Sequence, residues 1–213
     1  MTRKLFWDNP YQTILETMIT AVDGSQVFLA ETIFFPFSGG QESDVGTIDG
    51  EPVLEARKTG TDITYLVSKN HSLQTGQAVT VKIEWERRYR LMRLHFAAEL
   101  VLELVYRMLD GIEKIGAHIA VDKARLDFNW PSSFAPLLPQ VAAEAATLID
   151  QDLPIVSAFS DRQKERRYWE VAGFAQVPCG GTHLKRTGEV GTVRLKRKNP
   201  GKGKERIEIY LLE

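Results

Sequence analysis

The pattern of apolar residues changes sharply near Trp85, and this change limits the folds open to the chain. Before it, apolar and polar residues roughly alternate, as in Ala78–Ile83, and Asp-Gly pairs at 23–24 and 49–50 favour tight turns. After it, residues 87–109 carry apolar side chains at helical spacing. Strands are therefore expected before Trp85 and a long helix directly after it.

These two patterns predict an α+β protein of two domains. Residues 1–84 are expected to form a small antiparallel β-barrel. Residues 85–213 mix helices and strands without strict βαβ alternation, which predicts an α/β two-layer sandwich. The elements expected there are a strand over 118–128, a helix from about 132 to 152, a strand over 154–159, a short charged helix from Asp161, and two strands flanking a loop at 199–203.

The charge distribution indicates a polyanionic partner. The 213 residues are 43% hydrophobic and 26% charged, as in soluble globular proteins, so disorder is not expected. The net charge is only -1, yet the segment from Lys185 to Arg206 holds nine Lys or Arg residues against Glu189 and Glu205. A basic segment of this kind can contact a nucleic acid.

The single cysteine and the hydropathy pattern favour a cytoplasmic location. One cysteine cannot form an internal disulfide, which fits a reducing compartment. The sequence has no signal-peptide-like start and no run of about 18 apolar residues, so no membrane association is expected.

Two residue pairs predict a zinc site. Cys179-Gly-Gly-Thr-His183 places the only cysteine four positions before a histidine, and His95 and Glu99 are spaced one helical turn apart. Two imidazoles, one carboxylate and one thiolate form an acceptable tetrahedral set for zinc if the fold brings the pairs together.

The spacing alone leaves other interpretations open. A His and a Glu at i and i+4 are often a surface pair, and a lone cysteine is often a small buried hydrophobe. Cys179 is also a candidate nucleophile with His183 as its base.

Two further features are ambiguous without other information. Residues 34–41 place aromatic side chains before two glycines and Gln41, either as a structural turn or as a loop whose amide binds a polar ligand. The arginines at 87, 88, 90 and 93 read as a solvated helix face or as phosphate contacts.

Taken together, several motifs resemble those of the AlaX family of freestanding alanyl-tRNA editing proteins. In order, they are Phe-Pro-Phe-Ser-Gly-Gly-Gln at 35–41, Met-Arg-Leu-His at 92–95, Ala-Arg-Leu-Asp-Phe at 124–128, Cys-Gly-Gly-Thr-His at 179–183 and Thr-Gly-Glu-Val-Gly at 187–191. The resemblance spans about residues 27–212. It implies the medium-length form, with an N-terminal barrel and a C-terminal editing domain.

The resemblance also implies an activity and a cofactor. The activity is hydrolysis of the ester that joins serine or glycine to alanine tRNA, with one zinc ion per chain. His95, Cys179 and His183 match family zinc ligands, whereas Glu99 stands where the family has a second histidine. By position, Gln41 matches the glutamine of the editing pocket.

Other assignments follow from this reading. Gln41 or Thr182 could hydrogen-bond the hydroxyl of a serine substrate. The tRNA acceptor end is expected against basic residues: Arg93, Lys185, Arg186, Lys196, Lys198, Lys202 and Lys204. The alternatives are a non-catalytic tRNA-binding module with a decayed metal site, or a deacylase for another mischarged tRNA. The sequence does not distinguish a monomer from a homodimer.

Overall fold

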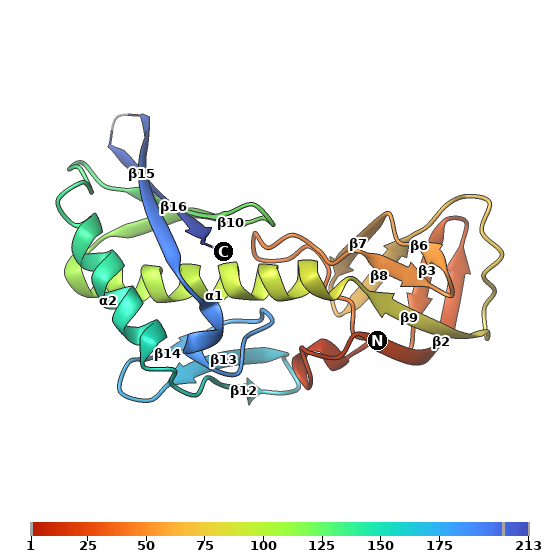
Figure 1. Cartoon of the computed structure of the whole chain (residues 1–213). Helices are drawn as coiled ribbons and strands as arrows, with labels where there is room; N and C mark the ends of the chain where they lie inside the picture. The colour runs from red at the N-terminus through yellow and green to blue at the C-terminus, as the bar shows by residue number, and fades with distance from the viewer. Residues whose placement is uncertain (1, 202, 213) are drawn as a thin grey trace. The chain divides into compact units, whose positions relative to one another are not determined.

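The computed structural model describes residues 2–201 and 203–212, and the chain divides into two compact units, Met1–Arg90 and Leu91–Glu213 (Figure 1). The α+β class and the antiparallel sheets are confirmed. Among the described helices, none is both long and apolar enough to span a membrane. Closure of the first sheet into a barrel, the two-layer sandwich and the domain boundary at residue 84 stay predictions.

The first unit is built on an antiparallel sheet of seven strands in the order β6-β5-β9-β2-β3-β8-β7. A long strand, β2, pairs with β9 through its first half and with β3 through its second half. The strands are β2 (Ile14–Asp23), β3 (Gln26–Leu29), β5 (Gly46–Ile48), β6 (Glu51–Pro52), β7 (Glu55–Thr59), β8 (Asp62–Leu66) and β9 (Ala78–Ile83). Beside them, β1 (Arg3–Lys4) pairs in parallel with β4 (Glu31–Thr32), and a 3-10 turn, η1, follows at Leu5–Trp7.

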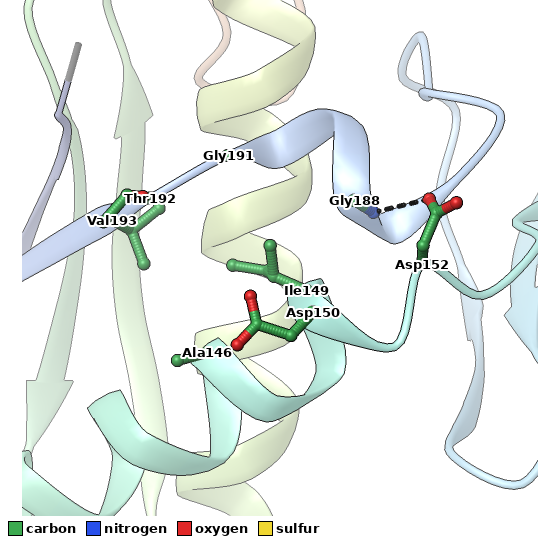
Figure 2. Close-up of a pocket in the computed structure, with 8 residues that line it drawn as sticks. All are labelled: Ala146, Ile149, Asp150, Asp152, Gly188, Gly191, Thr192 and Val193. Carbon is green, nitrogen blue, oxygen red and sulfur yellow. Dashed lines mark hydrogen bonds between the residues drawn. The ribbon is translucent and has the colours of Figure 1, made fainter.

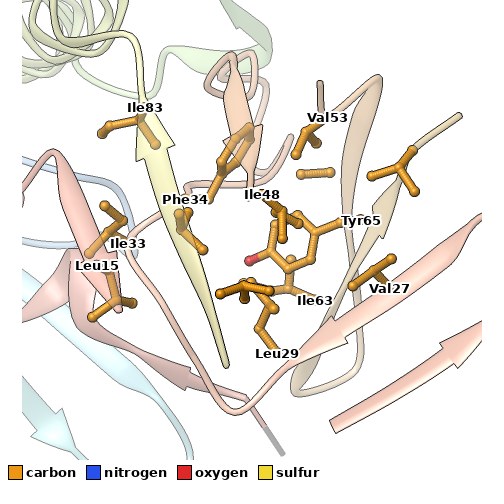
Figure 3. Close-up of a cluster of buried hydrophobic side chains, with 14 of the residues drawn as sticks. Leu15, Val27, Leu29, Ile33, Phe34, Ile48, Val53, Ile63, Tyr65 and Ile83 are labelled. Atoms are coloured by element: carbon orange, nitrogen blue, oxygen red, sulfur yellow. The ribbon is translucent and has the colours of Figure 1, made fainter. Parts of the chain in front are cut away.

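Alternation along these strands places the apolar side chains in one core (Figure 3). In β8, Ile63 and Tyr65 point inward while their neighbours are partly exposed, as the period of two requires. Tyr65 packs edge-on against Phe34, and its hydroxyl donates to Thr32 Oγ1 at 2.5 Å. The one polar atom of this side chain is therefore satisfied inside the core.

A buried ion pair joins Arg88 to Asp44 in the first unit. Arg88 is fully buried and donates through Nε to Asp44 Oδ1 at 2.8 Å and through Nη2 to Oδ2. Its guanidinium also donates to the carbonyls of Pro10 at 2.9 Å and Ile33 at 2.6 Å. Arg88 is thus neither solvated nor available to phosphate, and both interpretations of this residue from the sequence were wrong.

The second unit contains two antiparallel sheets and most of the long helix α1 (Trp85–Met108). The four-stranded sheet has the order β10-β11-β16-β15, and the three-stranded sheet the order β12-β13-β14. Their strands are β10 (Glu113–Ile119), β11 (Ala124–Asn129), β12 (Val156–Asp161), β13 (Arg166–Val171), β14 (Ala175–Pro178), β15 (Val193–Gly201) and β16 (Lys204–Leu211). From Leu91 to Val105, α1 is buried at nearly every position, because it is covered on all sides.

Three local expectations differ from the structure. The strand expected over 118–128 is a hairpin, since β10 ends at Ile119 and β11 begins at Ala124. The helix α2 begins only at Leu138 and runs to Asp150, with a proline in its first turn, where the missing N–H costs nothing. The charged helix expected from Asp161 is the turn of the β12–β13 hairpin, in which Asp161 Oδ1 accepts from the Lys164 amide at 3.0 Å.

We expect Arg88→Ala to lower the free energy of unfolding by about 3–5 kcal/mol, because it leaves the Asp44 carboxylate buried without its counter-charge. The matched control is Arg87→Ala, whose ion pair with Glu42 is partly exposed and is expected to contribute at most about 1 kcal/mol. Urea denaturation of both variants measures the difference, and equal losses would contradict this assignment.

Candidate metal centre

Three of the predicted metal ligands meet in the second unit. The donor atoms of His95, Cys179 and His183 all lie within 4.8 Å of one another. His95 comes from α1, whereas the other two come from the loop between β14 and the 3-10 turn η2 (Thr187–Val190). His95 and His183 are buried and Cys179 is partly exposed.

The separations between these atoms fit one zinc ion. The Cys179 Sγ atom lies 3.3 Å from His95 Nε2 and 3.3 Å from His183 Nε2. Glu99 adds a carboxylate oxygen, Oε1, at 3.7 Å from both Cys179 Sγ and His95 Nε2. A tetrahedral zinc with bonds of about 2.0–2.3 Å implies ligand–ligand distances of about 3.3–3.8 Å. His95, Cys179 and His183 therefore fit zinc in both chemistry and spacing, and Glu99 lies beside two of these three donors.

Close backbone approach at Gly181 makes this meeting possible. A Cβ atom at Gly181 would lie 2.6 Å from His95 Nε2, closer than such atoms approach one another. At Gly180, in contrast, a Cβ atom would have no heavy atom within 4 Å. Of the two glycines, only Gly181 is required by the packing of the loop on α1.

Hydrogen bonds from two neighbouring strands orient two of the candidate ligands, Glu99 and His183. Trp169 donates through Nε1 to Glu99 Oε2 at 3.1 Å, which leaves Oε1 to face Cys179 Sγ and His95 Nε2. Ser157 Oγ lies 3.0 Å from His183 Nδ1. Ser157 and Trp169 are direct cross-strand partners in β12 and β13, so one rung of this hairpin supports both ligands.

Burial sets the protonation states of the metal-free donors. Desolvation and, after it, the Glu99 carboxylate raise the pKa of the Cys179 thiol. Desolvation lowers the pKa of His95 and takes that of His183 well below its ordinary value. A neutral thiol beside a neutral imidazole does not form the thiolate–imidazolium pair of a cysteine nucleophile. The arrangement favours metal ligation, in which binding the ion displaces the thiol proton.

A buried arginine supplies positive charge next to the donors. Arg167 on β13 is 5% exposed, and its Nη1 donates to the Gly181 carbonyl at 3.2 Å. Its charge opposes the rise in the pKa of the Cys179 thiol and contributes to the lowered pKa of His183. Nothing in the sequence singled out Arg167, Trp169 or Ser157, because their roles depend on the register of β12 with β13.

The two residues predicted to recognise substrate are both buried with unsatisfied polar atoms. Thr182 is 1% exposed, and its hydroxyl has no hydrogen-bond partner in the described part of the chain. In the first unit, Gln41 is also 1% exposed, and neither atom of its amide group is paired within residues 2–201 and 203–212. Gln41 closes a turn in which its backbone N–H donates to the Ser38 carbonyl at 3.0 Å. An unpaired buried polar group costs about 1–3 kcal/mol, so both side chains suit ligand contacts.

The residues predicted to contact tRNA have different environments. Arg93 donates to the Val190 carbonyl at 3.0 Å, and Arg186 is held by Asp152 at 2.6 Å. The Lys185 amide donates to Glu189 Oε1 at 3.0 Å. The lysines at 196, 198 and 204 are exposed, and Lys202 lies outside the described residues.

A cavity of about 460 Å³ lies beside α2 and η2 but contains none of the four donors (Figure 2). It is lined by Ala146, Ile149, Asp150, Asp152, Gly188, Gly191, Thr192 and Val193. Asp152 in its wall accepts from the Gly188 amide at 3.2 Å, and Thr187 Oγ1 donates to the Leu148 carbonyl at 2.7 Å. The Thr-Gly-Glu-Val-Gly motif at 187–191 therefore anchors η2 to the end of α2.

Comparisons with known proteins agree with these features. Residues 171–208 match the family described as the threonyl and alanyl tRNA synthetase second additional domain. The chain is 31% identical to the alanyl-tRNA editing protein AlaX-M of Pyrococcus horikoshii, over 99% of this chain and 98% of that protein. It is 30% identical to AlaX-M of Saccharolobus solfataricus, over 97% and 98% respectively. Alanine–tRNA ligase of Ignicoccus hospitalis is 30% identical over 91% of this chain, which covers 24% of the ligase.

We expect Gly181→Ala to lower zinc affinity at least about tenfold, because the added methyl group would collide with the His95 ring. Gly180→Ala adds the same methyl group into open space and should leave zinc affinity unchanged. Competition with a chromogenic chelator measures both, and equal affinities in the two variants would contradict the packing described.

Proposed function

Because the chain belongs to the AlaX-M family of alanyl-tRNA editing proteins, we propose that it hydrolyses the ester bond of mischarged alanine tRNA. Water attacks the ester carbonyl, the bond to the 3'-terminal adenosine breaks, and free amino acid and tRNA leave. The proposed amino acids are serine and glycine. A synthetase pocket sized for alanine cannot exclude the smaller glycine and rejects an added hydroxyl only modestly, so a second site is needed.

The observation that carries the proposal is the convergence of three zinc-type donors, His95, Cys179 and His183, in the second unit, with the Glu99 carboxylate beside two of them. His95, Glu99, Cys179 and His183 would hold one zinc ion per chain. When bound, zinc supplies Lewis-acid stabilisation of charge on a carbonyl oxygen or on water. In this proposal, the decayed-site alternative is disfavoured because Glu99 Oε1 retains ligand-like distances to Cys179 and His95.

Replacing a neutral histidine by Glu99 adds one negative charge, and Arg167 offers the compensation. With zinc, one thiolate and one carboxylate, the four-ligand centre is neutral. The Arg167 guanidinium donates to the Gly181 carbonyl in the loop that carries Cys179 and His183, and it adds a positive charge beside the centre. We propose that this cation helps to stabilise the negative charge that develops on the carbonyl oxygen during attack by water.

For substrate selection we propose Thr182 and Gln41. Each has a buried side chain whose polar atoms lack partners in the described part of the chain, so each can pair with a hydroxyl or an amino group of the substrate. A serine hydroxyl paired in this way distinguishes serine from alanine, which offers no partner for the same group.

The activity is tested by incubating purified protein with alanine tRNA charged with serine, glycine or alanine, with zinc content measured on the same samples. We expect serine or glycine to be released faster than alanine, with about one zinc per chain, as a single four-ligand centre requires. Cys179→Ala should lose both zinc and activity.

A metal-free wild-type protein that binds tRNA without releasing any amino acid would contradict the proposal and favour a binding module. Serine-charged threonine tRNA is included as an alternative substrate. Preferential hydrolysis of that substrate would keep the chemistry but reassign the tRNA.

A further inference from the structure

The hairpin of β15 and β16 presents a row of cations on one face of the four-stranded sheet. Its register pairs Arg194 with Tyr210, Lys196 with Glu208, and Lys198 with Arg206, so all six side chains project from the same face. The other face carries the buried side chains of Ile207, Ile209 and Leu211. We call the first face the cationic face; it comprises Lys123, Arg125, Arg194, Lys196, Lys198, Arg206 and Tyr210, with Asp127 and Glu208.

The carboxylates of the cationic face are already engaged. Arg206 pairs with Asp127 at 2.5 Å, and Lys123 pairs with Glu208 at 2.7 Å. Three other cations of the cationic face are Arg194, Lys196 and Lys198, all on β15. Within the described residues, none of these three has a carboxylate within ion-pair distance, and all three are exposed. The face therefore carries excess positive charge that its own acidic residues do not balance.

Three cations of the cationic face lie around a single aromatic ring. Lys196 Nζ lies 5.2 Å, Arg194 Cζ 5.4 Å and Lys123 Nζ 5.8 Å from the centroid of the Tyr210 ring. The Tyr210 hydroxyl donates to Glu208 Oε2 at 2.9 Å, which fixes the ring at the centre of the group. Each cation gains from the ring, yet the three repel one another. A bound anion would relieve this repulsion.

We propose that the cationic face binds the phosphate backbone of the tRNA, an inference that rests on the proposed function. Alternate residues of a strand are about 6.6 Å apart, so Arg194, Lys196 and Lys198 form a linear array suited to successive phosphates. None of the β15 or β16 side chains from Arg194 to Lys198 and Arg206 to Tyr210 on this face is aliphatic, so nothing there would insert into a membrane. Arg194 and Tyr210 thereby join the expected tRNA contacts, whereas Arg93 and Arg186 already serve intramolecular contacts.

The test compares tRNA affinity and its salt dependence in two double variants of the full chain. Lys196→Gln with Lys198→Gln removes two charges from the cationic face. Arg162→Gln with Lys164→Gln removes two charges from the turn between β12 and β13 and is the matched control. We expect the first variant to bind alanine tRNA about tenfold more weakly and to flatten the dependence of log affinity on log salt by about two, and the control to change neither.

Deacylation separates the failure of this proposal from the failure of the proposed function. If the proposal holds, the first variant has a raised KM, an unchanged kcat and an unchanged zinc content. Wild-type levels of tRNA binding in that variant would overturn the proposal while leaving editing intact. Equal losses in both variants would overturn it as well, because they would indicate a diffuse charge effect. A wild-type protein that deacylates no tRNA would overturn the proposed function instead. Binding of the wild-type protein to acidic vesicles but not to tRNA would contradict the assignment of the cationic face as an RNA-binding site.

Discussion

The candidate centre depends on how closely the loop at Gly181 packs against His95. A Cβ atom there would lie 2.6 Å from His95 Nε2, so only glycine allows the loop to descend onto α1. That descent places Cys179 Sγ 3.3 Å from both imidazoles. Packing of the helix, which is buried at nearly every position from Leu91 to Val105, then fixes the other half of the donor set.

Bringing two buried and two partly buried polar side chains together costs free energy that hydrogen bonds from the surrounding strands offset. Trp169 holds one oxygen of Glu99, and Ser157 holds the far nitrogen of His183. Arg167 adds a positive charge near a thiol whose pKa desolvation raises. The three-stranded sheet is therefore a supporting layer for the centre, and its register matters as much as the ligands themselves.

The sequence could predict donors, but not what holds them. His95, Cys179 and His183 can be predicted as donors from their residue types and short spacing, which are visible without knowledge of the fold. Trp169 and Ser157 become functional only because β12 and β13 pair them directly, and strand register depends on non-local packing. Arg88 illustrates the same limit, since an arginine in the first turn of a helix gives no local sign of a buried partner 44 positions away. The charged segment after Asp161 has the polar residues of a helix start but forms a hairpin turn, because the two kinds of structure share these residue types.

The most direct test of the account is the zinc affinity of Glu99→Ala, Trp169→Phe and the double variant, measured by chelator competition. If Glu99 is a ligand that Trp169 orients, Trp169→Phe should weaken zinc binding about 10–100-fold. Glu99→Ala should weaken it at least as much, and the double variant should be no weaker than Glu99→Ala. Wild-type affinity in Glu99→Ala would contradict the account, because the centre would then hold zinc through His95, Cys179 and His183 alone.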